Sequence, residues 1–107
     1  MGDMAKLMKS AKDIQERMEA LQEELRTTMV TGESGAGLVK ATATAKGELT
    51  GLDIDPSIFN PEEKEVVEDL ILAAIKDAQT KAAEKSQAEM ASLTESFGFP
   101  AGMKLPF

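Results

Sequence analysis

The first quarter of the chain carries apolar residues at alternating intervals of three and four. They form one unbroken heptad seam, made of Met4, Leu7, Ala11, Ile14, Met18, Leu21 and Leu25. The spacing predicts a helix over about residues 3–26, roughly 30–35 Å long at about 1.5 Å per residue. So narrow a seam favours pairing with another helix, and packing of the helix on the protein's own sheet is the alternative.

After this helix the pattern changes to the alternation of β-strands, which we expect within residues 27–55. Residues 27–31 are rich in β-branched side chains, and residues 38–45 (LVKATATA) alternate with alanines on the inner face. Lys46-Gly47 predicts a short hairpin turn, after which a strand resumes over residues 48–55. We expect one side of this last strand to carry Thr50, Leu52 and Ile54. The segment predicts a three-stranded antiparallel meander, and its small alanines allow close packing by a helix or by a second sheet.

A second helix is predicted over about residues 61–93. Asn60 is a suitable N-cap, Pro61 suits the first helical position, and acidic residues follow at the positive helix end. The apolar face comprises Val66, Val67, Leu70, Ile71, Ala74, Ile75, Ala78 and Ala82. Because apolar residues thin out after Ala82, we expect the first half to cover the sheet and the second half to project.

The order of these elements predicts an α+β fold, α-β-β-β-α, in one domain spanning residues 1–107. The tail, residues 96–107 (SFGFPAGMKLPF), holds two Gly, two Pro and three Phe. This composition is unsuited to a helix and too apolar for an inert tail, so we expect the tail to dock or to order on binding.

The amino-acid composition excludes several classes of function. The 107 residues include four Phe, no Trp and no Tyr, so the core of a single copy is thin and association into a dimer is expected. The absence of Cys and His removes thiolate nucleophiles, imidazole bases and ordinary transition-metal sites. We therefore expect no enzyme activity and no cofactor. No apolar run is long enough for a membrane helix, and we expect a cytoplasmic protein.

The net charge of −7 argues against a uniformly basic nucleic-acid binder, but the charge is unevenly distributed. Residues 1–12 are locally basic, whereas residues 61–107 are acidic. Three lysines, Lys6, Lys9 and Lys12, fan over the helix face opposite the apolar seam and could contact a phosphate backbone. A solvated face is the alternative. Lesser candidates are Arg17, Lys81 and Lys85, and the last two could instead pair with Asp77 and Glu89, four residues away.

Two other patterns could indicate ligand-binding sites, but each has a simpler structural explanation. Gly32, Gly35 and Gly37 lack the Lys-Ser/Thr that ends a phosphate-binding loop, so we interpret them as a hairpin turn requiring positive φ. Asp53 and Asp55 could hold a hard cation, but a strand end facing solvent explains them better.

Longer stretches of the sequence resemble the YbaB/EbfC family of bacterial nucleoid-associated proteins. The resemblance is sharpest over residues 30–40 (VTGESGAGLVK) and continues through Ile54-Asp55-Pro56-Ser57 and Glu68-Asp69-Leu70. It ends at residues 100–107 (PAGMKLPF), where Ala is inserted between the Pro and Gly of the family pattern.

The resemblance implies a homodimer whose long helices project like tweezer arms from a central β-structure and grip double-stranded DNA. It also implies a place in the nucleoid. The rival hypothesis is an acidic dimeric module that binds replication or recombination proteins through its seam or its Phe-rich tail. In either case the residues expected to pack in the protomer or the dimer are Leu7, Ile14, Met18, Leu21, Leu25, Leu38, Leu52, Ile54, Leu70 and Ile71.

Overall fold

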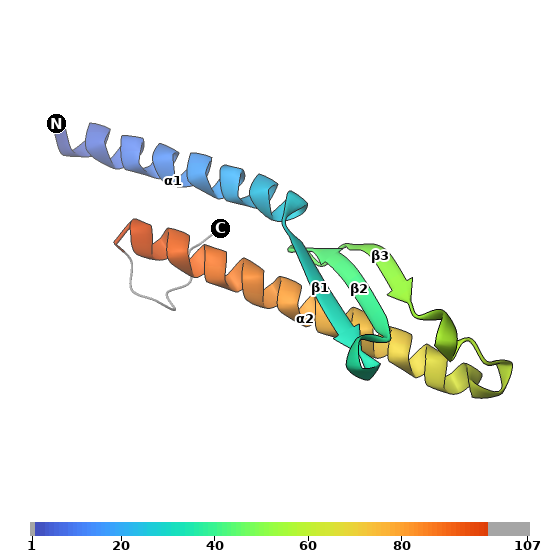
Figure 1. Ribbon diagram of the computed structural model, residues 1–107. Helices are drawn as coiled ribbons and strands as arrows, with labels where there is room; N and C mark the ends of the chain where they lie inside the picture. Colours follow the sequence, from blue (N-terminus) through green and yellow to red (C-terminus); the bar gives the residue numbers. More distant parts are fainter. Residues whose placement is uncertain (1, 99–107) are drawn as a thin grey trace.

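The computed structural model describes residues 2–98 and has an elongated shape, 74 × 22 × 17 Å. Its radius of gyration is 19.7 Å, whereas a compact chain of this length has about 13 Å. Two helices and one sheet follow in the predicted α-β-β-β-α order, which confirms the α+β class (Figure 1). The elements are α1 (Gly2–Thr27), β1 (Met29–Ser34), β2 (Val39–Thr44), β3 (Leu49–Ile54) and α2 (Lys64–Ser96).

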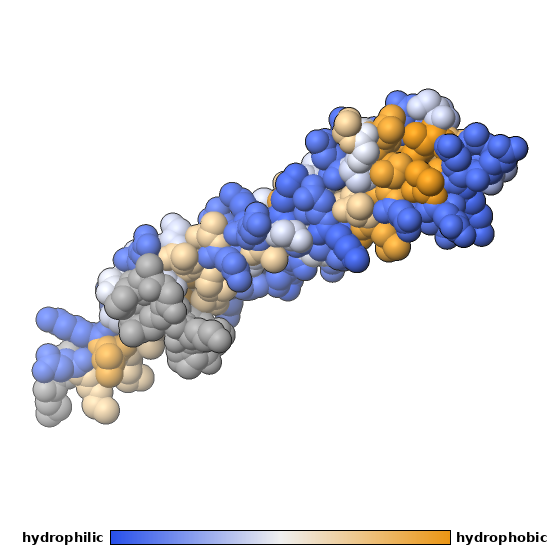
Figure 2. Space-filling model, turned by 90° about the horizontal axis from the view of Figure 1, so that it is seen from below, coloured by the Kyte–Doolittle hydropathy of each residue, from blue (hydrophilic) through white to orange (hydrophobic). Residues whose placement is uncertain are grey.

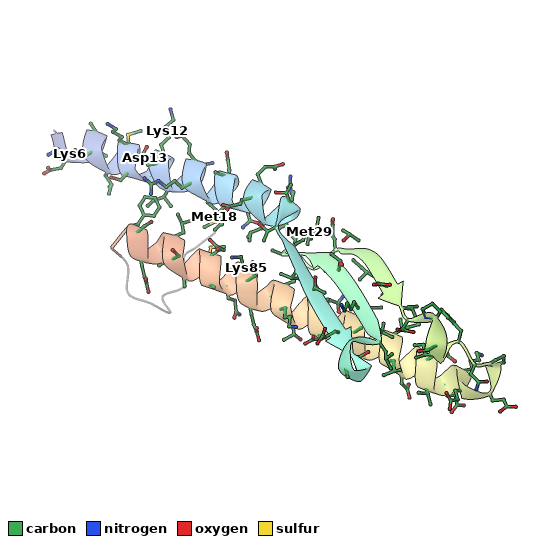
Figure 3. The ribbon with its side chains drawn as sticks, in the orientation of Figure 1. Lys6, Lys12, Asp13, Met18, Met29 and Lys85 are labelled. Carbon is green, nitrogen blue, oxygen red and sulfur yellow. The ribbon has the colours of Figure 1, made fainter. Side chains whose placement is uncertain are left out.

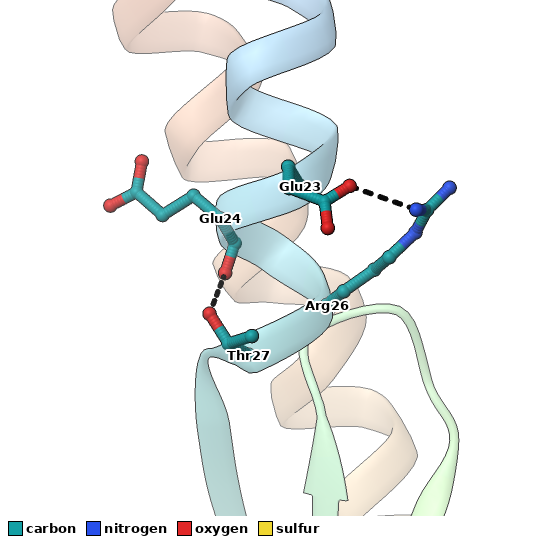
Figure 4. A network of polar contacts seen from close by, with 4 residues as sticks. All are labelled: Glu23, Glu24, Arg26 and Thr27. Carbon is teal, nitrogen blue, oxygen red and sulfur yellow. Dashed lines mark hydrogen bonds and ion pairs between the residues drawn. The ribbon is translucent and has the colours of Figure 1, made fainter.

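Threonine hydroxyls end α1 where the β-branched segment begins. Thr27 and Thr28 each donate a side-chain hydrogen bond to the carbonyl of Glu24, at 3.1 and 2.8 Å. Beside them Arg26 pairs with Glu23 at 2.9 Å (Figure 4). The threonine hydroxyls thus offer the Glu24 carbonyl partners outside the helical pattern, at the point where the chain leaves α1 and enters β1.

The predicted cap of the second helix is confirmed, although the helix itself begins later. The Asn60 side chain accepts a hydrogen bond from the Glu62 amide at 3.1 Å. This bond caps a single 3₁₀ turn over Pro61–Glu63, and α2 continues from Lys64. The proline fits at the start of the turn, where its missing N–H costs no hydrogen bond.

The sheet is antiparallel with the order β1-β2-β3. Ile54 lies opposite Val39 and Leu52 opposite Ala41, so these apolar residues share one face. A bulge then places Leu49 rather than Thr50 opposite Ala43, so the expected position of Thr50 on that face was wrong. Thr50 is the extra residue, and its hydroxyl donates to the carbonyl of Thr42 at 3.2 Å.

Small side chains join α2 to the sheet. Val39, Ala41 and Ala43 of β2 are fully buried against Ala74 and Ala78 of α2. The covering element is therefore a helix, and alanines on both sides let it lie close. Larger, partly buried residues surround this contact: Val30, Ile54, Ile58, Leu70, Ile71 and Ile75.

Gly32 is the point of closest approach between β1 and α2. A Cβ atom at this position would lie under 3.0 Å from backbone atoms of Ala74 and Ala78. The expectation that Gly32 belongs to the turn was wrong, because β1 runs on through Ser34 and needs the glycine for space. The turn expectation is confirmed for Gly35 and Gly37, which have φ of 58° and 90°.

Side chains of α2 close the outer edge of β1. The Asp77 carboxylate accepts a hydrogen bond from the Glu33 amide at 3.0 Å, and Lys81 donates to the Thr31 carbonyl at 3.3 Å. Lys81 and Asp77 also pair at 3.1 Å. The pKa of Asp77 is lowered, first by the bond from the Glu33 amide and then by Lys81. Two of the outward-facing backbone groups of β1 are therefore satisfied by side chains of α2.

The heptad seam of α1 is divided into two parts. Leu21 and Leu25 are buried in a second cluster with Ala45, against Met90 and Leu93 of α2. This part of the seam therefore pairs within the protomer. Nearer the N-terminus, where α1 extends beyond the end of α2 (Figure 1), Met4, Leu7 and Ala11 are exposed, whereas Ile14 and Met18 between the two parts are half-buried.

We predict that Gly32→Ala destabilises the protein by about 1–3 kcal/mol or more, because the methyl group meets helix backbone that cannot rotate away. Urea unfolding would measure the change. Gly51→Ala is the matched control, since a Cβ at Gly51 meets nothing within 4 Å. Equal effects of the two substitutions would contradict the close approach at Gly32.

We also predict a pH-dependent contribution from Asp77. Its folded-state pKa is lowered, so its stabilisation is present above the unfolded pKa of about 3.9 and is lost as the pH falls through the folded pKa. Asp77→Asn should therefore lower the urea midpoint at pH 7 and make little difference once the carboxyl is protonated. A difference that stays constant between pH 7 and pH 3 would show that the charge of Asp77 contributes nothing.

Candidate nucleic-acid interface

The basic end of α1 is the part of the structure best suited to contact nucleic acid. Lys6, Lys9 and Lys12 are exposed and lie on the side of the helix opposite the seam. Figure 3 shows Lys12 pointing away from α2, whereas Met18 of the seam lies in the space between the two helices. Within residues 2–98 none of the three lysines forms a salt bridge.

The basic surface is short. Asp13 and Glu16 come next on the same side of α1, so positive charge ends at Lys12. Lys6 and Lys12 are about 9 Å apart along the helix axis at about 1.5 Å per residue. We name the surface formed by Lys6, Lys9 and Lys12 the basic tip.

The excess of acidic over basic residues is greatest at the other end of the molecule. The richest acidic segment is the start of α2 and the turn before it, which Figure 1 shows opposite the N-terminus of α1. The molecule is 74 Å long, whereas the Debye length at physiological salt is about 8 Å. The distant carboxylates are therefore screened from the basic tip, and the net charge of −7 does not describe its surroundings.

The other three candidate cations are engaged in contacts of their own. The Arg17 guanidinium lies over the Phe97 ring, 5.3 Å from its centroid. Lys81 pairs with Asp77 at 3.1 Å and Lys85 pairs with Glu89 at 2.9 Å. The pairing expected from the four-residue spacing is confirmed. The structure thus does not gather the six candidates into one surface.

Two leucines on β3 are exposed, of which only Leu52 was among the residues expected to pack in the protomer or the dimer. Leu49 and Leu52 lie on the sheet face that α2 covers, yet they are 43% and 46% exposed because α2 packs on β1 and β2. A helix about 10 Å wide covers two strands spaced about 4.8 Å apart and leaves the third open. Sequence could have indicated this, since the predicted order offers three strands and only the first half of one helix to cover them.

Two more large apolar side chains are exposed toward the end of the molecule where α2 begins. Phe59, which follows β3, and Leu72 of α2 are 63% and 55% exposed. Figure 2 shows hydrophobic side chains gathered over the first half of α2 and bordered by hydrophilic ones. We call the exposed apolar residues Leu49, Leu52, Phe59 and Leu72 together the apolar strip.

Two other kinds of site receive no support from the described residues. No group of three or more acidic side chains within residues 2–98 is placed to share a metal ion. Asp55 instead accepts a hydrogen bond from the Ser57 amide at 2.9 Å. Hydrogen bonding by the Ser57 side chain, and then by its amide, lowers the pKa of Asp55. Over the same residues neither helix is apolar enough along its length to cross a membrane.

Comparison with known proteins agrees with this architecture. The profile of the YbaB/EbfC DNA-binding family matches residues 1–97. A nucleoid-associated protein of Agrobacterium fabrum is 45% identical over 107 residues, which is the whole of both chains. The crystal structure of an uncharacterized protein from Helicobacter pylori superposes with a TM-score of 0.70 at 25% identity, covering 83% of this chain and 94% of that one. The chain belongs to the YbaB/EbfC DNA-binding family.

Proposed function

We propose that the protein binds double-stranded DNA as a homodimer, through the basic tips of its projecting α1 helices. The proposal rests above all on Lys6, Lys9 and Lys12, which are exposed cations on an arm that extends beyond the sheet. Family membership and a nucleoid-associated relative support DNA as the ligand and the nucleoid, in the cytoplasm, as the place of action.

The chemistry of the basic tip favours recognition of the backbone over recognition of bases. Lysine ammonium groups attract phosphate oxygens and carry little sequence information. The described part of α1 offers no aromatic side chain for base stacking. We therefore expect modest affinity, strong salt dependence and a preference set by DNA shape.

The apolar strip supports the homodimer. Leu49, Leu52, Phe59 and Leu72 are large side chains left open beside a core made mostly of alanines. Burying such a side chain fully is worth about 1.5–3 kcal/mol. A second copy seated on the strip would supply this burial and would bring two basic tips into one particle.

Arg17, Lys81 and Lys85 have a smaller part in the proposal. Each is partly neutralised or held by a contact within the protomer. Lys81 in particular closes the edge of β1, so its removal would disturb folding as well as charge. The alternative function, docking of replication or recombination proteins without DNA contact, predicts no DNA binding by the basic tip.

We predict that replacing Lys6, Lys9 and Lys12 together by Ala weakens binding to a short labelled duplex by about 10-fold or more at low salt. Alanine preserves helix propensity, so the arm should remain folded. Fluorescence anisotropy at several salt concentrations would measure both affinity and salt slope. The slope should fall by about 0.9 for each phosphate that the variant no longer neutralises.

A matched control replaces Lys40, Lys46 and Lys76 by Ala. These lysines are also exposed, lie away from the basic tip, and give the same change in net charge. We expect their removal to affect binding much less. Equal effects of the two triple substitutions would point to bulk charge instead of the tip. Undiminished binding by the tip variant would remove α1 from the site.

We predict that Leu52→Asp converts the dimer to a monomer, because a carboxylate would be buried without a partner in the apolar strip. Light scattering coupled to size exclusion would measure the mass. Gly51→Asp is the control, since it adds the same charge to the opposite face of β3, where a side chain meets open space. A dimer that survives Leu52→Asp would place the interface elsewhere.

A further inference from the structure

Two carboxylates follow the basic tip on the same side of α1. Asp13 lies one heptad after Lys6, and Glu16 lies one heptad after Lys9. Because a straight helix drifts by only about 20° per heptad, each carboxylate is nearly in line with a lysine along the helix axis. Both acidic residues are exposed. The charge on this side of the arm therefore changes from positive to negative within one turn. We name Asp13 and Glu16 the acidic pair.

The nearby cations do not neutralise the acidic pair. Asp13 is four residues after Lys9, and Glu16 is four residues after Lys12, a spacing that permits ion pairs. Lysine before the acid is the less favourable order for such a pair, and among residues 2–98 no salt bridge includes Asp13 or Glu16. The Arg17 guanidinium, four residues after Asp13, is held by its contact with an aromatic ring instead. Within the described chain both negative charges therefore remain able to repel an anionic ligand.

A phosphate backbone lying lengthwise on α1 would meet the acidic pair directly after the basic tip. One strand of double-stranded DNA carries a phosphate about every 3.4 Å along the duplex axis, and the basic tip is about 9 Å long. The tip therefore has room for about three phosphates of one strand. The next phosphates would lie beside the acidic pair, at separations below the Debye length of about 8 Å, so salt would screen the repulsion only in part. A backbone that crosses the tip and then leaves the helix avoids this repulsion.

We propose that Asp13 and Glu16 confine the DNA backbone to the first three turns of α1, so that the arm crosses the backbone at its tip instead of lying along it. This role rests on the proposed function, in which the basic tip binds DNA. The acidic pair does not bind DNA itself. It limits the number of phosphates that each arm neutralises to about three, and so keeps the affinity modest.

Asp13→Asn together with Glu16→Gln tests this role, because each amide keeps the shape of the carboxylate and removes its charge. We expect binding to a short labelled duplex to tighten about 5-fold or more at low salt, since two repulsive charges are removed from beside the phosphates. The gain should shrink as salt is added, because screening weakens the same repulsion. Fluorescence anisotropy of the full chain at several salt concentrations would measure both effects.

Two control variants separate local charge from other causes. Glu62→Gln with Glu63→Gln makes the same change in net charge at the opposite end of the molecule, and should change binding by less than about 2-fold. Asp13→Glu with Glu16→Asp keeps both charges on the arm and should bind like the unmodified protein. An equal gain from either control, or no gain from the amide variant, would overturn the role of the acidic pair.

A cation placed beyond the acidic pair tests the confinement itself. Ala20 is exposed and lies one heptad after Asp13, on the same side of α1. Ala20→Lys should change binding by less than about 2-fold in the otherwise unmodified protein, because the backbone does not reach this position. Added to the amide variant, it should steepen the salt slope by up to about 0.9 per arm, since the backbone can then follow the helix. Equal effects in the two backgrounds, including no effect in either, would overturn the confinement.

The outcomes also separate this role from the proposed function. No binding of the duplex by the unmodified protein would contradict both. Duplex binding that depends on the lysines of the basic tip, but does not tighten when the acidic pair is neutralised, would overturn the confinement alone.

Discussion

The backbone of β1 lies directly against the backbone of α2 at Gly32, and the arrangement of the whole molecule depends on this contact. Because no side chain separates them, the Asp77 carboxylate and the Lys81 ammonium can reach the open edge of β1. The contact fixes the first half of α2 over β1 and β2. The rest of this 33-residue helix, about 50 Å long, has no sheet beneath it and runs along α1 instead.

Two uncovered surfaces follow from this geometry. One helix cannot cover three strands, so β3 keeps an apolar strip that a second copy could bury. The helices also outrun the sheet, so the N-terminal part of α1 becomes an arm with a basic tip. The same elongation separates this tip from the acidic start of α2 by several Debye lengths. A protein with a net charge of −7 can therefore present a positive end to a phosphate backbone.

Sequence periodicity predicted most of the fold because long helices and alternating strands depend on local pattern. The alternation of residues 38–45 placed Val39, Ala41 and Ala43 on the face that α2 covers, and Asn60 marked the helix start. Gly32 was misassigned because a glycine needed for close approach and a glycine needed for a turn look alike in sequence. The bulge that moves Thr50 off the expected face arises from the pairing of β3 with β2. The sequence of one strand alone does not predict that pairing.

The candidate site was predictable only in part for the same reason. The spacing of Lys6, Lys9 and Lys12 places them on one helix face, and the four-residue spacing predicted the pairs formed by Lys81 and Lys85. The exposure of the strip on β3 depends on how wide a helix is relative to the sheet it covers. The contact of Arg17 with Phe97 joins opposite ends of the chain, which no local pattern reveals.

The most direct test of DNA binding by the arm is to titrate a short DNA duplex into isotopically labelled protein and follow the backbone amide resonances. We expect the largest shifts to cluster in the first four turns of α1, around Lys6, Lys9 and Lys12. Amides of β3 and of the acidic start of α2 should change little. Shifts concentrated on the sheet, with α1 unperturbed, would contradict the assignment of DNA binding to the arm.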